Sequence, residues 1–443
     1  MIYWQKRSLS QKHKLTGSEV WEALFADEAT TTLLESPAQV LSKTSRYSIM
    51  GANPYRVWTP PLGKILSSLG QMQTEAQTSA NPDDLPFIGG FLGWLGYDLA
   101  WEIEKLPYLK PDTLPFPVAF WYEPTNFAVV DHQTNMVWLG SSNRGDLEEM
   151  SDRFSHNQNQ VKYPDPKTRF SQIEFTTDQN AYKDMVDQAQ RHILAGDIFQ
   201  ANLSLRFYFE AYTDGWEIYK RLHQINPSPF ASYWRTQWGE VISVSPERLI
   251  SLEGDRLESR PIAGTRPRGN TPEMDRFYAQ ELLASTKEQA EHIMLVDLER
   301  NDLGRVCNWG SVNVDELLAI ENYSHVMHLV SNVVGTLNPK FNDIDVIRAV
   351  FPGGTITGCP KVRCMEIIEN LEPVRRSLFY GSCGYIDSRG NLDLNILIRT
   401  LLKCGDRLWG QVGAGIVADS VAETEWLESL QKAKAVFAVL NSF

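Results

Sequence analysis

Residues 199–209 constrain the fold most, because apolar and polar side chains alternate along this stretch. The apolar positions are Phe199, Ala201, Leu203, Leu205, Phe207 and Phe209, and the polar positions between them are Gln200, Asn202, Ser204 and Arg206. A repeat of two residues predicts a β-strand with one apolar and one polar face. Apolar residues at helical spacing from Tyr182 to Leu194, followed by Gly196, predict a helix just before it. The polar face lies against either a cavity or solvent, and the pattern alone allows both.

Other apolar segments are spaced irregularly along the chain. They lie at 241–250, 293–298, 326–334, 383–386, 396–402 and 408–417, with helical patterns between several of them. Irregular spacing favours an α+β fold over regular βαβ winding. The polar stretch 141–180 is the best linker candidate. We therefore expect an N-terminal region at 1–160, with short strands, and a C-terminal region at 175–443.

The acidic balance of the chain limits what it binds. Its 443 residues carry a formal net charge of −13, which argues against nucleic acid and against an anionic membrane surface. A negatively charged substrate must therefore be held by a local cluster of Arg, Lys or metal. Five cysteines, none in a Cys-x-x-Cys pair, are expected to be free thiols. Because neither a signal-peptide h-region nor a long apolar run is found, the expected location is the cytoplasm.

Two pairs of glutamates have the spacing of a helical face. Glu288 and Glu291 are three residues apart on a predicted helix, and Glu425 and Glu428 repeat that spacing on the C-terminal helix, one turn before Lys432. Two facing pairs of carboxylates are suited to a hard divalent cation such as Mg²⁺. For either pair alone, solvated surface charge is the simpler explanation.

Three further polar residues lie in or beside apolar strands. Glu247 follows a strand at Ser245-Pro246 and is either a general acid with a pKa raised by burial or an exposed turn residue. His328 is either a pocket residue or a satisfied core histidine. Arg399, expected within an apolar strand, needs an anion, which is either a substrate carboxylate or a protein carboxylate.

Two glycine-rich loops are candidates for binding an anion through backbone N–H groups. One spans residues 351–361 and ends in Lys361, which would add positive charge, and the other spans 413–417. Neither is a P-loop, since the first lacks the Gly-x-x-x-x-Gly-Lys-Ser/Thr order. Ordinary turns account for each loop as well.

Taken together, these residues resemble the chorismate-utilising enzymes. The resemblance is dense over 175–443 and looser before it. It rests on Gly196-Asp197-Ile198-Phe199-Gln200, Ser245-Pro246-Glu247, Pro261-Ile262-Ala263-Gly264-Thr265, Ala290-Glu291-His292, Gly358-Cys359-Pro360-Lys361-Val362-Arg363 and Gly413-Ala414-Gly415-Ile416-Val417-Ala418-Asp419-Ser420. It implies the fold of anthranilate synthase component I, a large two-lobed sandwich of mainly antiparallel β-sheets with helices packed outside.

The resemblance also implies a role for each matching residue. Glu291 and Glu428 would bind Mg²⁺ directly, with Glu288 and Glu425 nearby through water. Glu247 would be the general acid that assists loss of the hydroxyl group at carbon 4 of chorismate. The chorismate carboxylates would be held by Tyr380, Arg399, Gly413, Gly415 and Lys432, while Thr265, His328 and Thr355 would line the ring pocket.

Two positions bear on the reaction. Isochorismate and salicylate synthases have a water-activating Lys where this chain has Gln200, so ammonia is the expected nucleophile. Many aminodeoxychorismate synthases have a nucleophilic Lys where this chain has Ala263, and anthranilate synthases have Ala there. The stretches 200–203, 229–233 and 244–248 are more similar to aminodeoxychorismate synthases. The favoured product is therefore 4-amino-4-deoxychorismate, with anthranilate as the alternative and a non-catalytic amidotransferase scaffold as a third hypothesis.

Partners follow from what the sequence contains. It has no glutaminase signature, so ammonia is expected from solution or from a glutamine amidotransferase subunit. Glu35, Ser36 and Pro229 lie in stretches that resemble the tryptophan site of the family. That site would be regulatory, structural or merely a place where loops pack.

Overall fold

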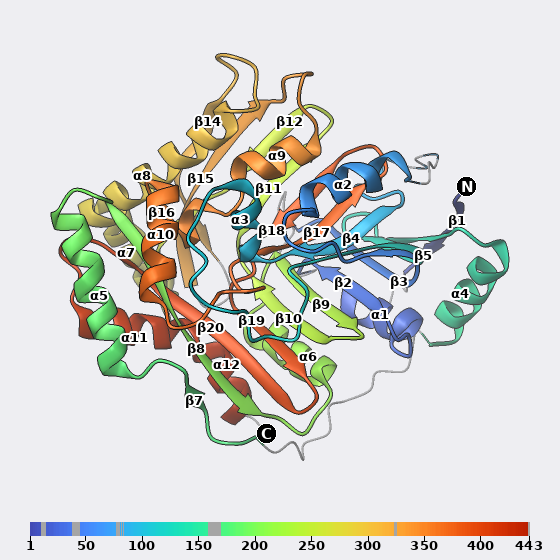
Figure 1. Cartoon of the computed structure of the whole chain (residues 1–443). Coiled ribbons are helices and arrows are strands. Elements are labelled where there is room, and N and C mark those ends of the chain that lie inside the picture. Colours follow the sequence, from blue (N-terminus) through green and yellow to red (C-terminus); the bar gives the residue numbers. More distant parts are fainter. Residues whose placement is uncertain are drawn as a thin grey trace.

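The longest strand, β5 (Ala119–Asp131), joins two series of strands. The computed structural model describes residues 1–9, 15–37, 45–76, 80, 82, 84–157, 170–322 and 326–441. One edge of β5 pairs with β3 (Tyr47–Trp58). The other edge pairs with β4 (Gly90–Leu95) through residues 119–122 and with β6 (Met136–Ser141) through residues 126–131. β5 therefore starts two arms of hydrogen-bonded strands, which Figure 1 shows layered across the molecule.

The first arm runs from β3 to the long strand pair that holds the alternating segment. Neighbouring strands are antiparallel throughout. In order from β3 it contains β2 (Thr31–Glu35), β9 (Phe230–Thr236), β10 (Gly239–Ser245), β19 (Thr400–Cys404), β20 (Arg407–Ile416) and β8 (Gln200–Glu210), with the short β7 (Glu174–Phe175) and β16 (Gly358–Cys359) on β8.

The second arm runs from β4 and is also antiparallel. In order it contains β17 (Ser382–Asp387), β18 (Leu392–Asn395), β11 (Arg248–Glu253), β12 (Arg256–Ser259) and β15 (Val326–Thr336), which pairs with both β13 (Ile262–Pro267) and β14 (Asn313–Asn322). The remaining strand, β1 (Tyr3–Ser8), pairs with β6.

Alternate residues of the first arm face two different cores. Trp234, Val241 and Leu402 pack with residues of the second arm such as Leu394 in one apolar cluster between the arms. Their sequence neighbours, such as Tyr233, pack with the outer helices in a second cluster. The alternation places every second side chain of a strand on the opposite face, and the result is a sandwich with helices outside, as expected from the sequence.

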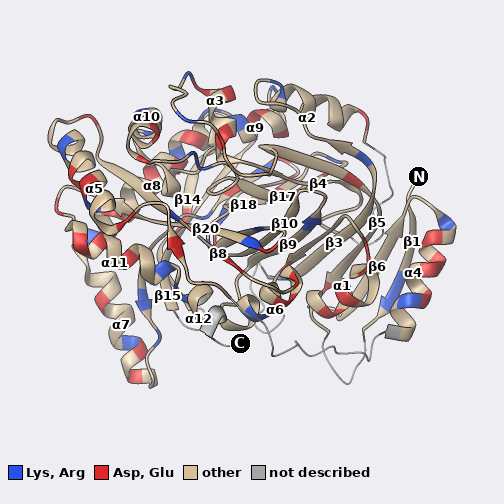
Figure 2. Ribbon diagram, turned by 60° about the horizontal axis from the view of Figure 1, so that its bottom comes forward, with Lys and Arg blue, Asp and Glu red and all other residues tan. Residues whose placement is uncertain are grey.

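Helices cover the outer faces of the sandwich. Acidic and basic positions alternate along outer helices such as α4, α5 and α7 (Figure 2). In the part of the chain that the structure describes, no helix has both the length and the apolarity required to span a bilayer. The helices are α1 (Gly17–Phe25), α2 (Ile65–Thr74), α3 (Ala100–Ile103), α4 (Arg144–Asn157), α5 (Gln179–Leu194), α6 (Gly215–Ile225), α7 (Pro272–Ala284), α8 (Thr286–Gly304), α9 (Asp343–Val350), α10 (Lys361–Leu371), α11 (Ala422–Lys432) and α12 (Lys434–Asn441).

Several expected elements are confirmed. α5 and β8 occupy the predicted helix and strand, and Gly196 follows the helix with a φ of 79°. Phe199 differs, because it precedes the strand and is 69% exposed. Both glutamate pairs lie on helices, α8 and α11.

Other expectations are corrected by the structure. The apolar segment 241–250 is two strands rather than one, because Pro246 has no N–H to donate to a ladder. The segment 293–298 belongs to the helix α8. The linker candidate at 141–180 contains the helix α4 and the start of α5, and its residues 158–169 lie outside the described residues. Strands of the two predicted regions pair with each other, β2 with β9 and β4 with β17, and the division into regions stays a prediction.

Candidate active site

Glu247 lies where the chain leaves the first arm and enters the second. β10 ends at Ser245 and β11 begins at Arg248, so Pro246 and Glu247 form the crossover. The Glu247 side chain is buried, with only 5% of its surface exposed. Burial raises its pKa to about 8, the contact with Thr355 lowers it, and the negative charge of Glu299 raises it again. A carboxyl group with this pKa is protonated at neutral pH and is able to donate a proton.

Arg399 lies at a second crossover, directly beside the first. The chain passes from β18 to β19 through residues 396–399, and Ile396 N–H donates to the Glu247 carbonyl at 3.0 Å. Val244 N–H donates to the Arg399 carbonyl at 3.2 Å. Arg399 was expected inside an apolar strand, but it precedes β19 with a left-handed φ of 51°. Its positive charge reaches both Glu247 and His328.

Thr265 and His328 face each other across a bulged strand pair. Thr265 Oγ1 and His328 Nδ1 are 2.9 Å apart, and β13 and β15 change register between Ala263 and Thr265. Gly264 at the bulge has a φ of 71°, which favours glycine. Burial, together with the positive charge of Arg399, lowers the pKa of His328 to about 3. The histidine is therefore neutral, and Ala263 lies beside it, opposite Leu329.

Glu291 is held by an amide of the alternating strand. Gln200 Nε2 donates to Glu291 Oε1 at 2.8 Å. Gly415 on the neighbouring strand leaves room for this contact, because a Cβ there would lie 2.3 Å from Gln200 Nε2 and 3.3 Å from Glu291 Oε1. Burial raises the pKa of Glu291, and the charges of Glu288 and Glu428 add to the rise. The carboxylates of the two helices therefore lie within electrostatic reach of one another.

The other three carboxylates have protein partners. Arg266 Nη1 lies 3.1 Å from Glu288 Oε1, and Lys432 Nζ lies 2.9 Å from Glu428 Oε1. Glu425 is buried, which raises its pKa, and a hydrogen bond with the Ser420 side chain lowers it. Across the described ranges, no group of three or more His, Cys, Asp or Glu side chains is gathered as a ready-made metal site.

The donor set nevertheless fits a hard divalent cation. All four groups offer carboxylate oxygens. The pKa of Glu291 is raised first by burial and then by the negative charges of Glu288 and Glu428, and a bound cation would offset those charges. Binding would require Glu428 to exchange its contact with Lys432 for the metal.

Two of the predicted anion-binding residues, Lys432 and Gly415, lie next to these carboxylates. Lys432 Nζ also donates to the Gly413 carbonyl at 2.9 Å, which joins α11 to β20. Tyr380 is buried, and the guanidinium carbon of Arg376 lies 4.7 Å from the centre of its ring. Thr355 lies near both Glu247 and Asn202, because its side chain lowers the pKa of Glu247 and its carbonyl accepts from Asn202 Nδ2 at 3.3 Å.

Sequence reasoning missed a buried charged group behind Glu247. Glu299 accepts from Ser259 Oγ at 2.8 Å, and its pKa is raised by burial and by Asp302. Lys361, expected to add charge to an anion loop, is buried instead and its ammonium pairs with Asp302 at 2.5 Å. The sequence did contain a signal for this buried group. Glu299 and Asp302 are three residues apart and follow Glu288 and Glu291 in the same predicted helix, so they repeat the spacing of that glutamate pair.

The tentative tryptophan residues lie apart from this site, in a cavity of about 660 Å³ that all three line. Ser36 Oγ donates to the Pro229 carbonyl at 3.0 Å, and Tyr219 donates to Glu35 Oε2 at 2.8 Å. The structure thus brings Glu35, Ser36 and Pro229 together, as the sequence predicted. It separates them from the carboxylates and from Glu247.

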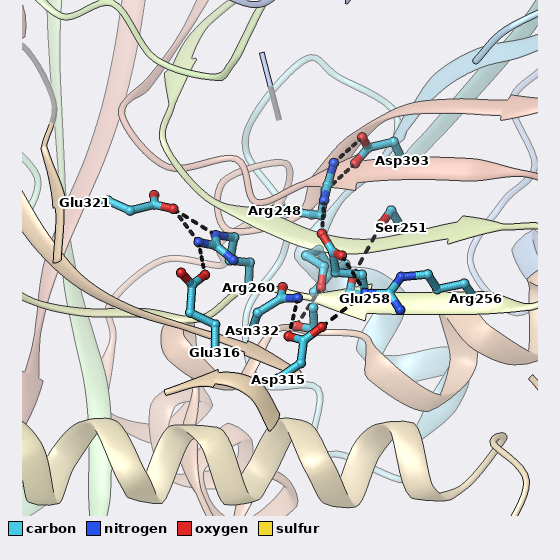
Figure 3. Close-up of polar contacts among 12 residues, drawn as sticks. Arg248, Ser251, Arg256, Glu258, Arg260, Asp315, Glu316, Glu321, Asn332 and Asp393 are labelled. Atoms are coloured by element: carbon cyan, nitrogen blue, oxygen red, sulfur yellow. Dashed lines mark hydrogen bonds and ion pairs between the residues drawn. The ribbon is translucent and has the colours of Figure 1, made fainter. Parts of the chain in front are cut away.

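A network of charged side chains forms one wall of this cavity and continues toward the strand pair of the active site (Figure 3). Arg248, the residue after Glu247, makes two hydrogen bonds of 2.9 and 2.8 Å to Asp393 and one of 2.8 Å to Glu258. Arg260 forms a separate group beside this network, in which it pairs with Glu321 and with Glu316. Arg260 directly precedes the loop 261–265, so these two ion pairs anchor the start of that loop.

Comparison with known proteins agrees with this geometry. The family model described as chorismate binding enzyme matches residues 21–438. A protein of Synechocystis sp. named anthranilate synthase component I-like protein is 57% identical over 437 residues, covering 96% of this chain and 90% of that protein. Aminodeoxychorismate synthase component 1 of Bacillus subtilis is 45% identical over 376 residues, covering 82% and 80%. The crystal structure of anthranilate synthase component I from Streptococcus pneumoniae superposes with a TM-score of 0.80 at 30% identity, covering 89% of this chain and 93% of that one.

Proposed function

This chain belongs to the chorismate-binding enzyme family, and we propose that it aminates chorismate with ammonia to give 4-amino-4-deoxychorismate. The observation that carries the amination is the contact of Gln200 with Glu291. Water addition requires a base at this position, and an amide side chain is not a base. Ammonia, unlike water, needs no such base once it is unprotonated. Similarity to aminodeoxychorismate synthase component 1 of B. subtilis supports carbon 4 as the aminated atom.

Glu247 supplies the proton that the departing hydroxyl group needs, and the proton lost by ammonia restores the balance. The hydroxyl group at carbon 4 leaves as water when it accepts this proton, and ammonia replaces it with loss of one of its own protons. Chorismate and ammonia thus give 4-amino-4-deoxychorismate and water. The support is the burial of Glu247 and its pKa of about 8, which keep the carboxyl protonated at neutral pH. A non-catalytic scaffold would have no use for a carboxyl held in this state.

Chorismate carries two carboxylates, which must be held against an overall charge of −13. Arg399 and Lys432 supply positive charge, while Tyr380 and the backbone of Gly413 and Gly415 supply donors. Thr265, His328 and Thr355 line the ring pocket, where the low pKa of His328 keeps it from adding charge. Mg²⁺ on Glu291 and Glu428, with Glu288 and Glu425 behind them, would neutralise one substrate carboxylate.

Anthranilate formation is the second candidate, and Ala263 favours it. An alanine methyl group cannot attack carbon 2 of chorismate, so no covalent adduct forms at this position. Ala263 lies beside Thr265 and His328, where ammonia would reach carbon 2 unobstructed. The name of the Synechocystis relative, anthranilate synthase component I-like protein, supports the same candidate.

Product analysis separates the two candidates. The chain is incubated with chorismate, Mg²⁺ and an ammonium salt, with and without an added aminodeoxychorismate lyase. Our proposal predicts p-aminobenzoate only when the lyase is present, and Ala263→Lys should raise its yield because a primary amine is a nucleophile. Fluorescent anthranilate without lyase, depressed by Ala263→Lys, would instead establish the second candidate.

A glutamine amidotransferase subunit is proposed as the source of ammonia. The support is the combination of an amination site with a sequence that has no glutaminase signature. The isolated chain should turn over chorismate with ammonium but not with glutamine, and an amidotransferase subunit should restore glutamine-dependent turnover. Glutamine-dependent activity of the pure chain alone would contradict this arrangement.

The separate cavity is proposed to bind tryptophan through Glu35, Ser36 and Pro229. Its volume of about 660 Å³ is ample for an amino acid, and Glu35 is a buried carboxylate in its wall. Calorimetric titration with tryptophan should show binding that Glu35→Gln weakens at least tenfold. A second sample is unfolded and refolded without tryptophan, which removes any tryptophan bound beforehand. If neither this sample nor the untreated wild type binds tryptophan, the proposed tryptophan site is rejected.

A further inference from the structure

Two buried amide oxygens on the polar face of β8 have no hydrogen-bond donor. These are Gln200 Oε1 and Asn202 Oδ1, both shielded from solvent, and among the described residues no donor lies within reach of either. A buried acceptor left unsatisfied costs about 1–3 kcal/mol. Two such oxygens in one small region therefore indicate a ligand that donates hydrogen bonds.

The orientation of each amide is fixed by its nitrogen. Gln200 Nε2 donates to Glu291 Oε1 at 2.8 Å, and Asn202 Nδ2 donates to the Thr355 carbonyl at 3.3 Å. Because both nitrogens face acceptors, rotating either amide would place an oxygen against an oxygen. The two free positions must therefore be oxygens.

These oxygens lie between the proposed metal ligands and the proposed general acid. Gln200 contacts Glu291, one of the proposed metal ligands, and Asn202 contacts Thr355, whose side chain lies near the general acid Glu247. Residues two apart on a strand share a face and are about 7 Å apart at their Cα atoms. A single nitrogen atom that donates one hydrogen bond of about 2.9 Å to each of two oxygens can bridge oxygens up to about 6 Å apart.

We propose that Gln200 Oε1 and Asn202 Oδ1 form a subsite that binds and orients ammonia. The inference rests on the proposed amination of chorismate and adds Asn202, to which no role has been given so far. Ammonia has three N–H donors and one lone pair, so two hydrogen bonds to the strand leave the lone pair free to attack. An ordered water would satisfy the same oxygens, and kinetics in ammonium distinguishes the two occupants.

The test measures steady-state KM values for ammonium, chorismate and Mg²⁺ separately. Asn202→Leu removes the acceptor and should raise the KM for ammonium at least tenfold, with the KM for chorismate within threefold of wild type. Asn202→Asp keeps an acceptor oxygen in the subsite but loses the hydrogen bond to the Thr355 carbonyl, so it should raise the KM for ammonium clearly less than Asn202→Leu does. If Asn202→Leu is insoluble, Asn202→Ser carries the same prediction, because its hydroxyl is too short to reach.

Asn332→Leu is the matched control. Asn332 is also a buried amide that donates once, to Asp315 at 2.8 Å, and whose oxygen has no donor among the described residues, but it lies on the charged network of Figure 3. The KM of the Asn332→Leu variant for ammonium should equal that of the wild type. An unchanged KM for ammonium in Asn202→Leu, with the wild type active, would overturn the subsite and show water alone there. If the wild type itself fails to aminate chorismate, the proposed function fails instead.

Discussion

Replacing Glu247 by Gln should remove turnover and at the same time stabilise the protein at neutral and alkaline pH. The Glu247 carboxyl has a pKa of about 8 in the folded protein, against 4.5 in an unperturbed chain. Between these values the unfolded chain has released the proton that the folded protein keeps. The folded state then binds more protons than the unfolded one, so stability falls as pH rises through this range. A glutamine has the same size and does not titrate.

The expected magnitude follows from these two pKa values. Each pH unit in this range corresponds to about 1.36 kcal/mol. From about pH 5 to about pH 8, the wild type should therefore lose about 4 kcal/mol of unfolding free energy relative to Glu247→Gln. Above pH 8 the difference should level off, because the folded carboxyl then ionises as well.

Urea midpoints measured across this pH range test the argument, with turnover of chorismate assayed on the same samples. Glu273→Gln is the control, because Glu273 is an exposed surface carboxylate on α7 with an Arg276 partner, and its difference from wild type should be flat. Parallel curves for Glu247→Gln and the wild type would refute the claim that burial keeps Glu247 protonated. Retained turnover in Glu247→Gln would refute its role as the acid.

Two further substitutions test the carboxylate cluster. Glu428→Gln should raise the Mg²⁺ concentration for half-maximal activity at least tenfold, since it removes a proposed direct ligand. Glu423→Gln, on the same helix but paired with Lys183, should not. Equal Mg²⁺ dependence of the two variants would reject the assignment. Gly415→Ala should lower the free energy of unfolding by about 1–3 kcal/mol, because its Cβ would lie 2.3 Å from Gln200 Nε2. Gly70→Ala is the control and should be neutral or slightly stabilising, because its Cβ would have nothing within 4 Å. A Gly415→Ala protein as stable as the wild type in thermal unfolding would show that the Gln200 amide moves freely.

Local sequence patterns were enough to predict the elements that carry the site. Helical spacing located both glutamate pairs, and a repeat of two located β8 with its polar face. That face proved to be buried, as Gln200 shows. The choice between cavity and solvent depends on which elements cover the strand, and no local pattern contains that information.

Long-range contacts account for what the sequence did not predict. Arg399 looked like a strand residue because its neighbours are apolar, but those neighbours are buried at a crossover, where burial does not require strand geometry. Lys361 looked like an anion binder because glycines precede it. Its actual partner, Asp302, is distant in sequence and is brought to it by the packing of α8.

The walls of the active site belong to different arms of the sandwich. Thr265 and His328 come from the second arm, Gln200 and Gly415 from the first, and the apolar layer containing Trp234 separates the arms. The separation of these two walls of the proposed site therefore depends on the packing of that layer. A smaller side chain at Trp234 would let the walls approach each other, and a misplacement of about 1 Å costs on the order of a hundredfold in rate. Turnover should thus register such a change together with the melting curve, because truncating the fully buried Trp234 also costs about 3–5 kcal/mol of stability.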